Sequence, residues 1–107
     1  MKQFISLMKA GRPELQNDFF GHLSEAEHAA FINHCTFLKE KFAEGTIFFA
    51  GPSVEEDKEH FAIVVFNAKD KKEAEALMNS DPAVSIGILT SAVTEFSVFL
   101  SREFKTP

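Results

Sequence analysis

The sequence predicts a single α+β domain in which two helices pack on one face of an antiparallel sheet. Short runs rich in β-branched and aromatic residues alternate with two segments that begin with helix-capping signals. Gly and Pro lie between these runs, where turns are needed. The chain has 107 residues, which is the length of one domain, and no repeat or linker divides it.

The first half of the chain predicts a strand, a helix and a second strand. Residues 2–8 form the first apolar run. Ser24 and Glu27 then have the spacing of a capping box, so a helix should begin there and run to about Glu44. Gly45 suits the left-handed position after the helix. Residues 46–50 form the next strand, which Gly51-Pro52 ends.

The second half predicts a strand, a shorter helix and a last strand. The acidic residues 55–59 read as a hairpin loop before a strand at residues 61–66. Asp70 caps a helix that should end near Asn79, since the proline after Asp81 disfavours helical backbone there. A loop then leads to a strand at about residues 92–100, where apolar residues alternate with others.

This order, β-α-β-β-α-β, is the ferredoxin-like arrangement. Right-handed crossovers place both helices on one face of the sheet. The strands at 47–50 and 61–66 are apolar without alternation, as in strands covered on both sides. Because an exposed apolar face of several hundred Å² is typical of an interface, we expect a homodimer in which two sheets pack together.

Composition excludes several classes of partner. The net charge of −5 disfavours nucleic acid and anionic membrane surfaces, which both attract basic proteins. No apolar run approaches the ~20 residues of a membrane helix, and the N-terminal apolar run is too short for a signal peptide. Cys35 is the only cysteine, so no internal disulfide forms and a cytoplasmic location is expected.

The first helix and the end of the second suggest a site. On a helical wheel, Phe31, Cys35, Leu38 and Phe42 form the apolar stripe, with His34 on its flank. The second helix is about ten residues or ~15 Å long and runs antiparallel to the first. Asp81 should therefore lie level with His34, where a carboxylate would orient the imidazole for proton transfer. The alternative is a half-buried structural histidine, with Asp81 only turning the chain.

The sequence resembles the YCII-related (YciI-like) family along nearly its whole length, as a longer branch and as one domain spanning residues 1–107. The resemblance is carried by the run from His34 to Gly45, by Ala50-Gly51-Pro52 and by Glu73-Ala74-Glu75-Ala76-Leu77 followed by Asp81-Pro82. It implies a dimeric α+β barrel with a catalytic pair at His34 and Asp81. Some relatives act on chlorinated or hydroxylated aromatic compounds or on lactones.

Further residues are candidates for substrate binding. With 13 Phe and neither Tyr nor Trp, the pocket lining should be phenylalanine. The candidates are Arg12, Phe37, Phe48, Phe49, Gly51 and Pro52. Arg12-Pro13 is either a flap over the pocket or a simple loop. Some family members carry an arginine shortly before the histidine, where this chain has Phe31-Ile32-Asn33.

The remaining candidates favour structural roles. Cys35 is expected to be an inert residue of the apolar stripe. The spacing of His22, His28 and His60 fits no zinc pattern, so no metal site is expected. The function predicted is a cofactor-free lyase, isomerase or hydrolase acting on a small aromatic or lactone-like molecule. The alternatives are a non-catalytic ligand-binding or sensing dimer and a purely structural dimer.

Overall fold

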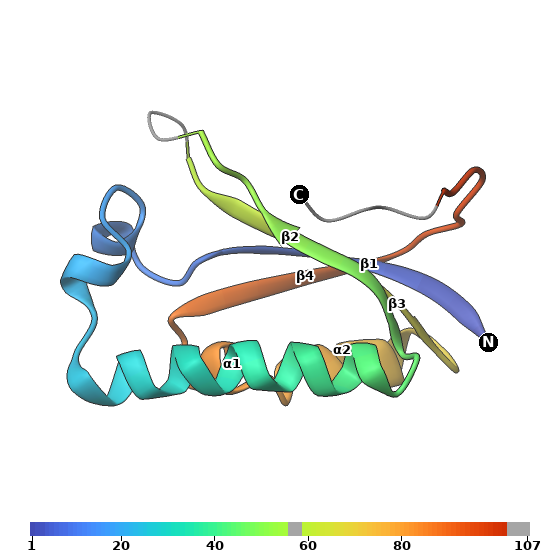
Figure 1. The fold of residues 1–107 in the computed structure, drawn as a ribbon, viewed down its shortest axis with the longest axis horizontal. Helices are drawn as coiled ribbons and strands as arrows, with labels where there is room; N and C mark the ends of the chain where they lie inside the picture. The colour runs from blue at the N-terminus through green and yellow to red at the C-terminus, as the bar shows by residue number, and fades with distance from the viewer. Residues whose placement is uncertain (56–58, 103–107) are drawn as a thin grey trace.

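The computed structural model describes residues 1–55 and 59–102 and confirms the α+β fold (Figure 1). The strands are β1 (Lys2–Ala10), β2 (Ile47–Pro52), β3 (Phe61–Ala68) and β4 (Leu89–Glu95). The α-helices are α1 (Glu25–Ala43), α2 (Lys71–Asn79) and the short α3 (Pro82–Ser85). Two 3₁₀ turns, η1 (Pro13–Leu15) and η2 (Phe20–His22), join β1 to α1. Of the predicted acidic hairpin loop, residues 56–58 lie outside the described residues.

The four strands form one antiparallel sheet in the order β2-β3-β1-β4, which is the ferredoxin-like order. Phe4 of β1 is opposite Phe66 of β3 and opposite Glu95 of β4. The helices α1 and α2 lie on the same face of the sheet (Figure 1). Within the residues that the structure describes, the opposite face carries no α-helix, as predicted.

The main core lies between the sheet and the helices. Phe4 and Phe66 are 0% exposed, and their ring centroids are 6.0 Å apart. Ala74 and Met78 of α2 belong to the same cluster and are also fully buried. Burying each large apolar side chain contributes about 1.5–3 kcal/mol, so this cluster fixes α2 on the sheet.

A second apolar cluster closes one end of the domain. Leu15 of η1, Ala83 of α3 and Ile88 form it, all nearly or fully buried. The backbone N–H of Gly11 donates to the carbonyl of Ile88 at 2.9 Å. A Cβ on Gly11 would lie 1.8 Å from the backbone oxygen of Gly87, so only glycine fits this approach. Two segments predicted as loops, the one before α1 and the one after α2, are therefore partly helical and packed.

The helix boundaries follow the predicted capping signals. Ser24 Oγ accepts from the backbone of Glu27, and the Glu27 side chain accepts from the backbone of Ser24. Gly45 follows α1 with a φ of +87°, a value that L side chains adopt only at a cost. Asp70 caps α2 by accepting from the N–H of Glu73 at 2.8 Å. Across the described ranges, no helix combines the length and apolarity that crossing a membrane requires.

The predicted position of the last strand, residues 92–100, is wrong at both ends. β4 begins at Leu89 and stops at Glu95. Its partner β1 begins at Lys2, so little neighbouring strand remains to pair with residues after Glu95. Gln3 instead accepts from two backbone N–H groups of the following segment, those of Phe96 and Val98. The apolar alternation that imitates a strand there leaves Phe99 91% exposed.

Candidate functional site

His34 lies in the middle of α1, and Asp81 is the residue that caps the start of α3. His34 Nδ1 and Asp81 Oδ2 are 2.5 Å apart. The side chain of His34 is 8% exposed and that of Asp81 is 0% exposed. The structure thus brings together the two side chains that the helix-length argument placed at the same level.

Asp81 uses its two carboxylate oxygens for different purposes. Oδ1 accepts from the backbone N–H of Ala83 at 2.8 Å, which caps α3. Oδ2 faces the imidazole of His34. Pro82 sets this geometry locally, because it occupies the first turn of α3 and keeps Asp81 extended. Asp81 therefore turns the chain and contacts the histidine at the same time, so the two interpretations of this residue are compatible.

The contact determines which nitrogen of His34 carries the proton. An ionised carboxylate only accepts hydrogen bonds, so Nδ1 is assigned as the donor to Asp81. In the neutral ring, Nε2 then holds a lone pair. Nε2 has no hydrogen-bond partner among the described residues, and no buried side-chain nitrogen or oxygen in that part of the chain lacks one. Nε2 must therefore reach the accessible surface.

The predicted apolar stripe of α1 is only partly the face that the helix buries, since Phe31 and Leu38 pack on the two apolar clusters. Ala30 and His34 are the buried residues of α1, and Leu38 packs on the main core beside them. Phe42, which was assigned to the stripe, is 61% exposed. The wheel places apolar residues together, but the surface that receives the helix decides which face is covered. His34 is consequently buried rather than on a flank, and Asp81 satisfies its Nδ1.

Arg12 forms a tight ion pair away from His34 and Asp81. Its guanidinium donates to both carboxylate oxygens of Glu27, at 2.6 and 2.9 Å, and to the carbonyl of His22 at 2.9 Å. The hydrogen bonds from Arg12 and from the backbone of Ser24 lower the pKa of Glu27 to about 2. The same pairing raises the pKa of Arg12. Arg12 thus ties the segment between β1 and α1 to the first turn of α1.

Phe37 lies on α1 and Phe48 on β2. Phe37 is half-buried, and the ammonium of Lys41 lies 5.8 Å from its ring centroid. Phe48 is 43% exposed at an irregularity in β2, where the pairing with β3 skips one residue. A β-bulge of this kind turns a side chain out of the regular alternation, and no pattern in the sequence predicts it.

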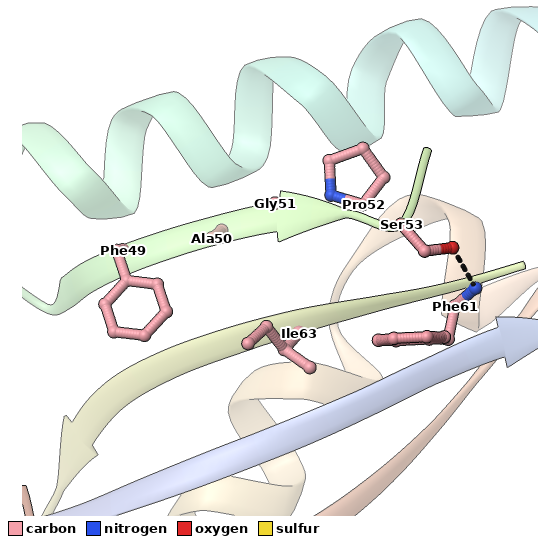
Figure 2. A pocket seen from close by; sticks show the side chains of 7 residues that line it. All are labelled: Phe49, Ala50, Gly51, Pro52, Ser53, Phe61 and Ile63. Carbon is pink, nitrogen blue, oxygen red and sulfur yellow. Dashed lines mark hydrogen bonds between the residues drawn. The ribbon is translucent and has the colours of Figure 1, made fainter. Parts of the chain in front are cut away.

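Three of the predicted substrate-binding residues, Phe49, Gly51 and Pro52, line a cavity of about 300 Å³ on β2 and β3 (Figure 2). The other lining residues are Ala50, Ser53, Phe61 and Ile63. Neither His34 nor Asp81 lines this cavity. The predicted site residues therefore do not form one site. His34 and Asp81 contact each other, and Phe49, Gly51 and Pro52 line the apolar hollow at the sheet edge. The other three, Arg12, Phe37 and Phe48, belong to neither group.

Three aromatic residues that were not predicted as site residues lie beside His34. The ring of Phe31 is 5.3 Å from that of His34, centroid to centroid. Phe19 and Phe20, from the segment before α1, contact Phe31 at 5.4 and 5.1 Å. A signal was present, because two adjacent phenylalanines in an otherwise polar segment need an apolar surface to pack on.

The other titratable candidates form no metal centre. Within residues 1–55 and 59–102, no three His, Cys, Asp or Glu side chains converge as a metal site would require. The ring of His22 bonds the carbonyl of Asp18, and that of His28 stacks on Phe20 at 6.4 Å. Cys35 is a free, half-buried thiol on α1.

Comparison with known proteins gives a family and a similar structure. The sequence model of the YCII-related domain matches residues 6–97. Among solved structures, the chain is similar to 5-chloro-2-hydroxyhydroquinone dehydrochlorinase from Burkholderia phenoliruptrix in complex with 2,5-dihydroxybenzoquinone. The TM-score is 0.54 at 13% identity, with 88% of this chain and 93% of that chain covered. No curated protein matches the sequence significantly.

Proposed function

The chain belongs to the YCII-related domain family, and on that basis we propose that it is a small-molecule enzyme in which His34 transfers a proton. One observation carries the proposal. A buried carboxylate holds Nδ1 of the histidine, while Nε2 reaches the accessible surface. A group with this arrangement can act as a general base without reorganising, because its tautomer is already set.

The role of each residue follows from this geometry. Nε2 of His34 takes a proton from a hydroxyl or an acidic C–H of the substrate. Asp81 keeps the ring oriented and stabilises the imidazolium that forms, and the proton later passes to water or to a product oxygen. Asp81 is therefore a positioning residue, whereas His34 is the catalytic one.

The substrate class proposed is a small hydroxylated, chlorinated aromatic compound, with a lactone as the other candidate. The similar solved structure supports this class, since its name describes the loss of HCl from a chlorinated trihydroxybenzene. In such an elimination the base removes a proton, and chloride leaves with both electrons of the C–Cl bond. The reaction is redox-neutral, so no cofactor is required.

The test compares turnover in wild type, His34→Gln and Asp81→Asn. Chloride release from chlorinated hydroquinones and opening of simple lactones are measured for each protein. We expect His34→Gln to lower kcat at least ~100-fold, the usual contribution of a general base. His60→Gln is the matched control, because His60 directly precedes β3 and belongs to neither α1 nor α3.

Two outcomes would contradict the proposal. Full turnover in His34→Gln, with folding intact, would remove His34 from the mechanism. Binding of these compounds without turnover in the wild type would favour a non-catalytic binding or sensing protein.

We also propose that the protein is a homodimer formed through the sheet face opposite the helices. Leu7 of β1 and Ile63 of β3 are paired on this face, and Phe61 lies two residues before Ile63. Leu7 is 37% exposed and Phe61 is 45% exposed. An apolar face of this kind is typical of an interface.

The assembly is tested by sedimentation velocity. The wild type should sediment as a dimer and Leu7→Glu as a monomer. Ile32→Glu is the control, since Ile32 is 67% exposed on α1. A monomeric wild type at the highest concentration measured would refute the dimer.

A further inference from the structure

Three phenylalanine rings from two separate segments meet beside His34. Phe19 and Phe20 are 5.2 Å apart, and each contacts Phe31 in an edge-to-face geometry. Phe31 in turn contacts the imidazole of His34 at 5.3 Å, with the two rings tilted by 41°. We call Phe19, Phe20 and Phe31 the aromatic cluster.

The aromatic cluster is not simply an interior core. Phe20 remains 55% exposed although it contacts Phe19, Phe31 and His28. Phe19 and Phe31 are half-buried. The exposed ring of Phe20 thus contacts Phe31, which in turn contacts His34. Nε2 of His34 also reaches the surface.

The segment that supplies Phe19 and Phe20 is fixed in place. Arg12, which precedes these rings in the sequence, donates hydrogen bonds to Glu27 and to the carbonyl of His22, which follow them. Asp18 accepts from the backbone N–H of Gly21 at 3.0 Å and stabilises the turn between them. The aromatic cluster is therefore formed before any ligand arrives, so little ordering is required on binding.

From this arrangement we propose that Phe20 and Phe31 determine specificity, forming a wall that selects flat aromatic rings over saturated rings at His34. The inference rests on the proposed function of His34. Aromatic rings favour edge-to-face and offset contacts with other π-systems beyond the burial of apolar area. A saturated ring of the same size gains the burial alone, so discrimination of about tenfold is expected.

The experiment measures this discrimination directly, without turnover. Dissociation constants of hydroquinone and of cyclohexane-1,4-diol are obtained by NMR titration of the full chain. The two probes have the same ring size and hydroxyl positions, but only the first is aromatic. Wild type should bind hydroquinone about tenfold more tightly than the diol.

Two leucine variants test the residues. Phe20→Leu and Phe31→Leu keep an apolar side chain but remove the ring. Each should reduce the ratio of the dissociation constant of the diol to that of hydroquinone at least about threefold. Phe42→Leu is the matched control, since Phe42 lies on the same helix and is 61% exposed. Because Phe20 is largely exposed, its variant keeps the test valid if Phe31→Leu fails to fold.

The outcomes separate this inference from the proposed function. A ratio unchanged in Phe20→Leu, or a wild type that binds both probes equally or binds neither, overturns the specificity role. If His34-dependent turnover persists in that case, the proposed function stands without the wall. Conversely, a ratio that falls in the leucine variants supports the wall even if His34→Gln leaves turnover unchanged.

Discussion

Replacing Asp81 tests whether one carboxylate both caps α3 and fixes the tautomer of His34. In Asp81→Ala both hydrogen bonds are lost, those to Ala83 N–H at 2.8 Å and to His34 Nδ1 at 2.5 Å. Losing the cap costs ~1 kcal/mol. Leaving the Nδ1–H of a side chain that is only 8% exposed without a partner costs about 1–3 kcal/mol more. The free energy of unfolding should therefore fall by roughly 2–4 kcal/mol.

Asp81→Asn should behave differently, because an amide oxygen can still cap α3. The amide N–H₂ would then face Nδ1 and can only donate to it, so the proton of His34 must move to Nε2. The unfolding free energy should drop by only about 1 kcal/mol, the net value of one hydrogen bond. The nitrogen meant to act as base would nevertheless be protonated, and turnover should fall at least ~100-fold.

Two measurements test whether Asp81 has both roles. Urea unfolding followed by circular dichroism gives the stabilities, and long-range ¹H–¹⁵N correlation spectra report which ring nitrogen of His34 carries the proton. The tautomers of His22, His28 and His60 serve as internal controls. The reasoning is refuted if Asp81→Ala and Asp81→Asn are equally stable, or if His34 keeps its proton on Nδ1 in Asp81→Asn.

Three further predictions concern the framework around the site. The hydrogen bonds from Arg12 and from the backbone of Ser24 lower the pKa of Glu27 from 4.5 to about 2. These interactions therefore contribute fully above pH 4.5, and their contribution disappears as the pH falls towards 2. In urea unfolding, the free energies of unfolding of wild type and Glu27→Gln should accordingly differ at neutral pH and become equal in acid. A difference that does not change with pH would contradict the pairing. Gly11→Ala would place a Cβ 1.8 Å from the backbone oxygen of Gly87, so the free energy of unfolding should fall by about 3 kcal/mol, seen as a lower melting temperature. An unchanged melting temperature would exclude the close approach. In Gly45→Ala the new Cβ contacts no atom within 4 Å, but the residue must adopt a φ of +87°. The free energy of unfolding measured in urea should therefore fall by about 1–2 kcal/mol, and an unchanged value would mean that the turn relaxes.

The candidate site could be predicted only in part from the sequence. The level of Asp81 beside His34 follows from the length of α2 and the rise per residue of a helix, together with the family resemblance. The substrate-binding set could not be predicted in this way. Phe49 and Phe48 lie around an irregular pairing of β2 with β3, and Arg12 is engaged by Glu27 rather than directed at the pair.

The sequence alone determined the features that depend on a few neighbouring residues. Ser24 with Glu27 starts α1, Gly45 ends it, and the proline after Asp81 stops α2, because each signal acts through hydrogen bonds or sterics within about one helical turn. The order of strands and helices follows from these local signals.

The tertiary structure decided which surfaces meet. It buried His34 instead of Phe42, ended β4 where the partner strand β1 ran out, and placed Phe20 beside α1. These outcomes depend on surfaces supplied by residues distant in the sequence, and no local pattern carries that information. Burial is a property of two packed faces, and one face alone cannot specify it.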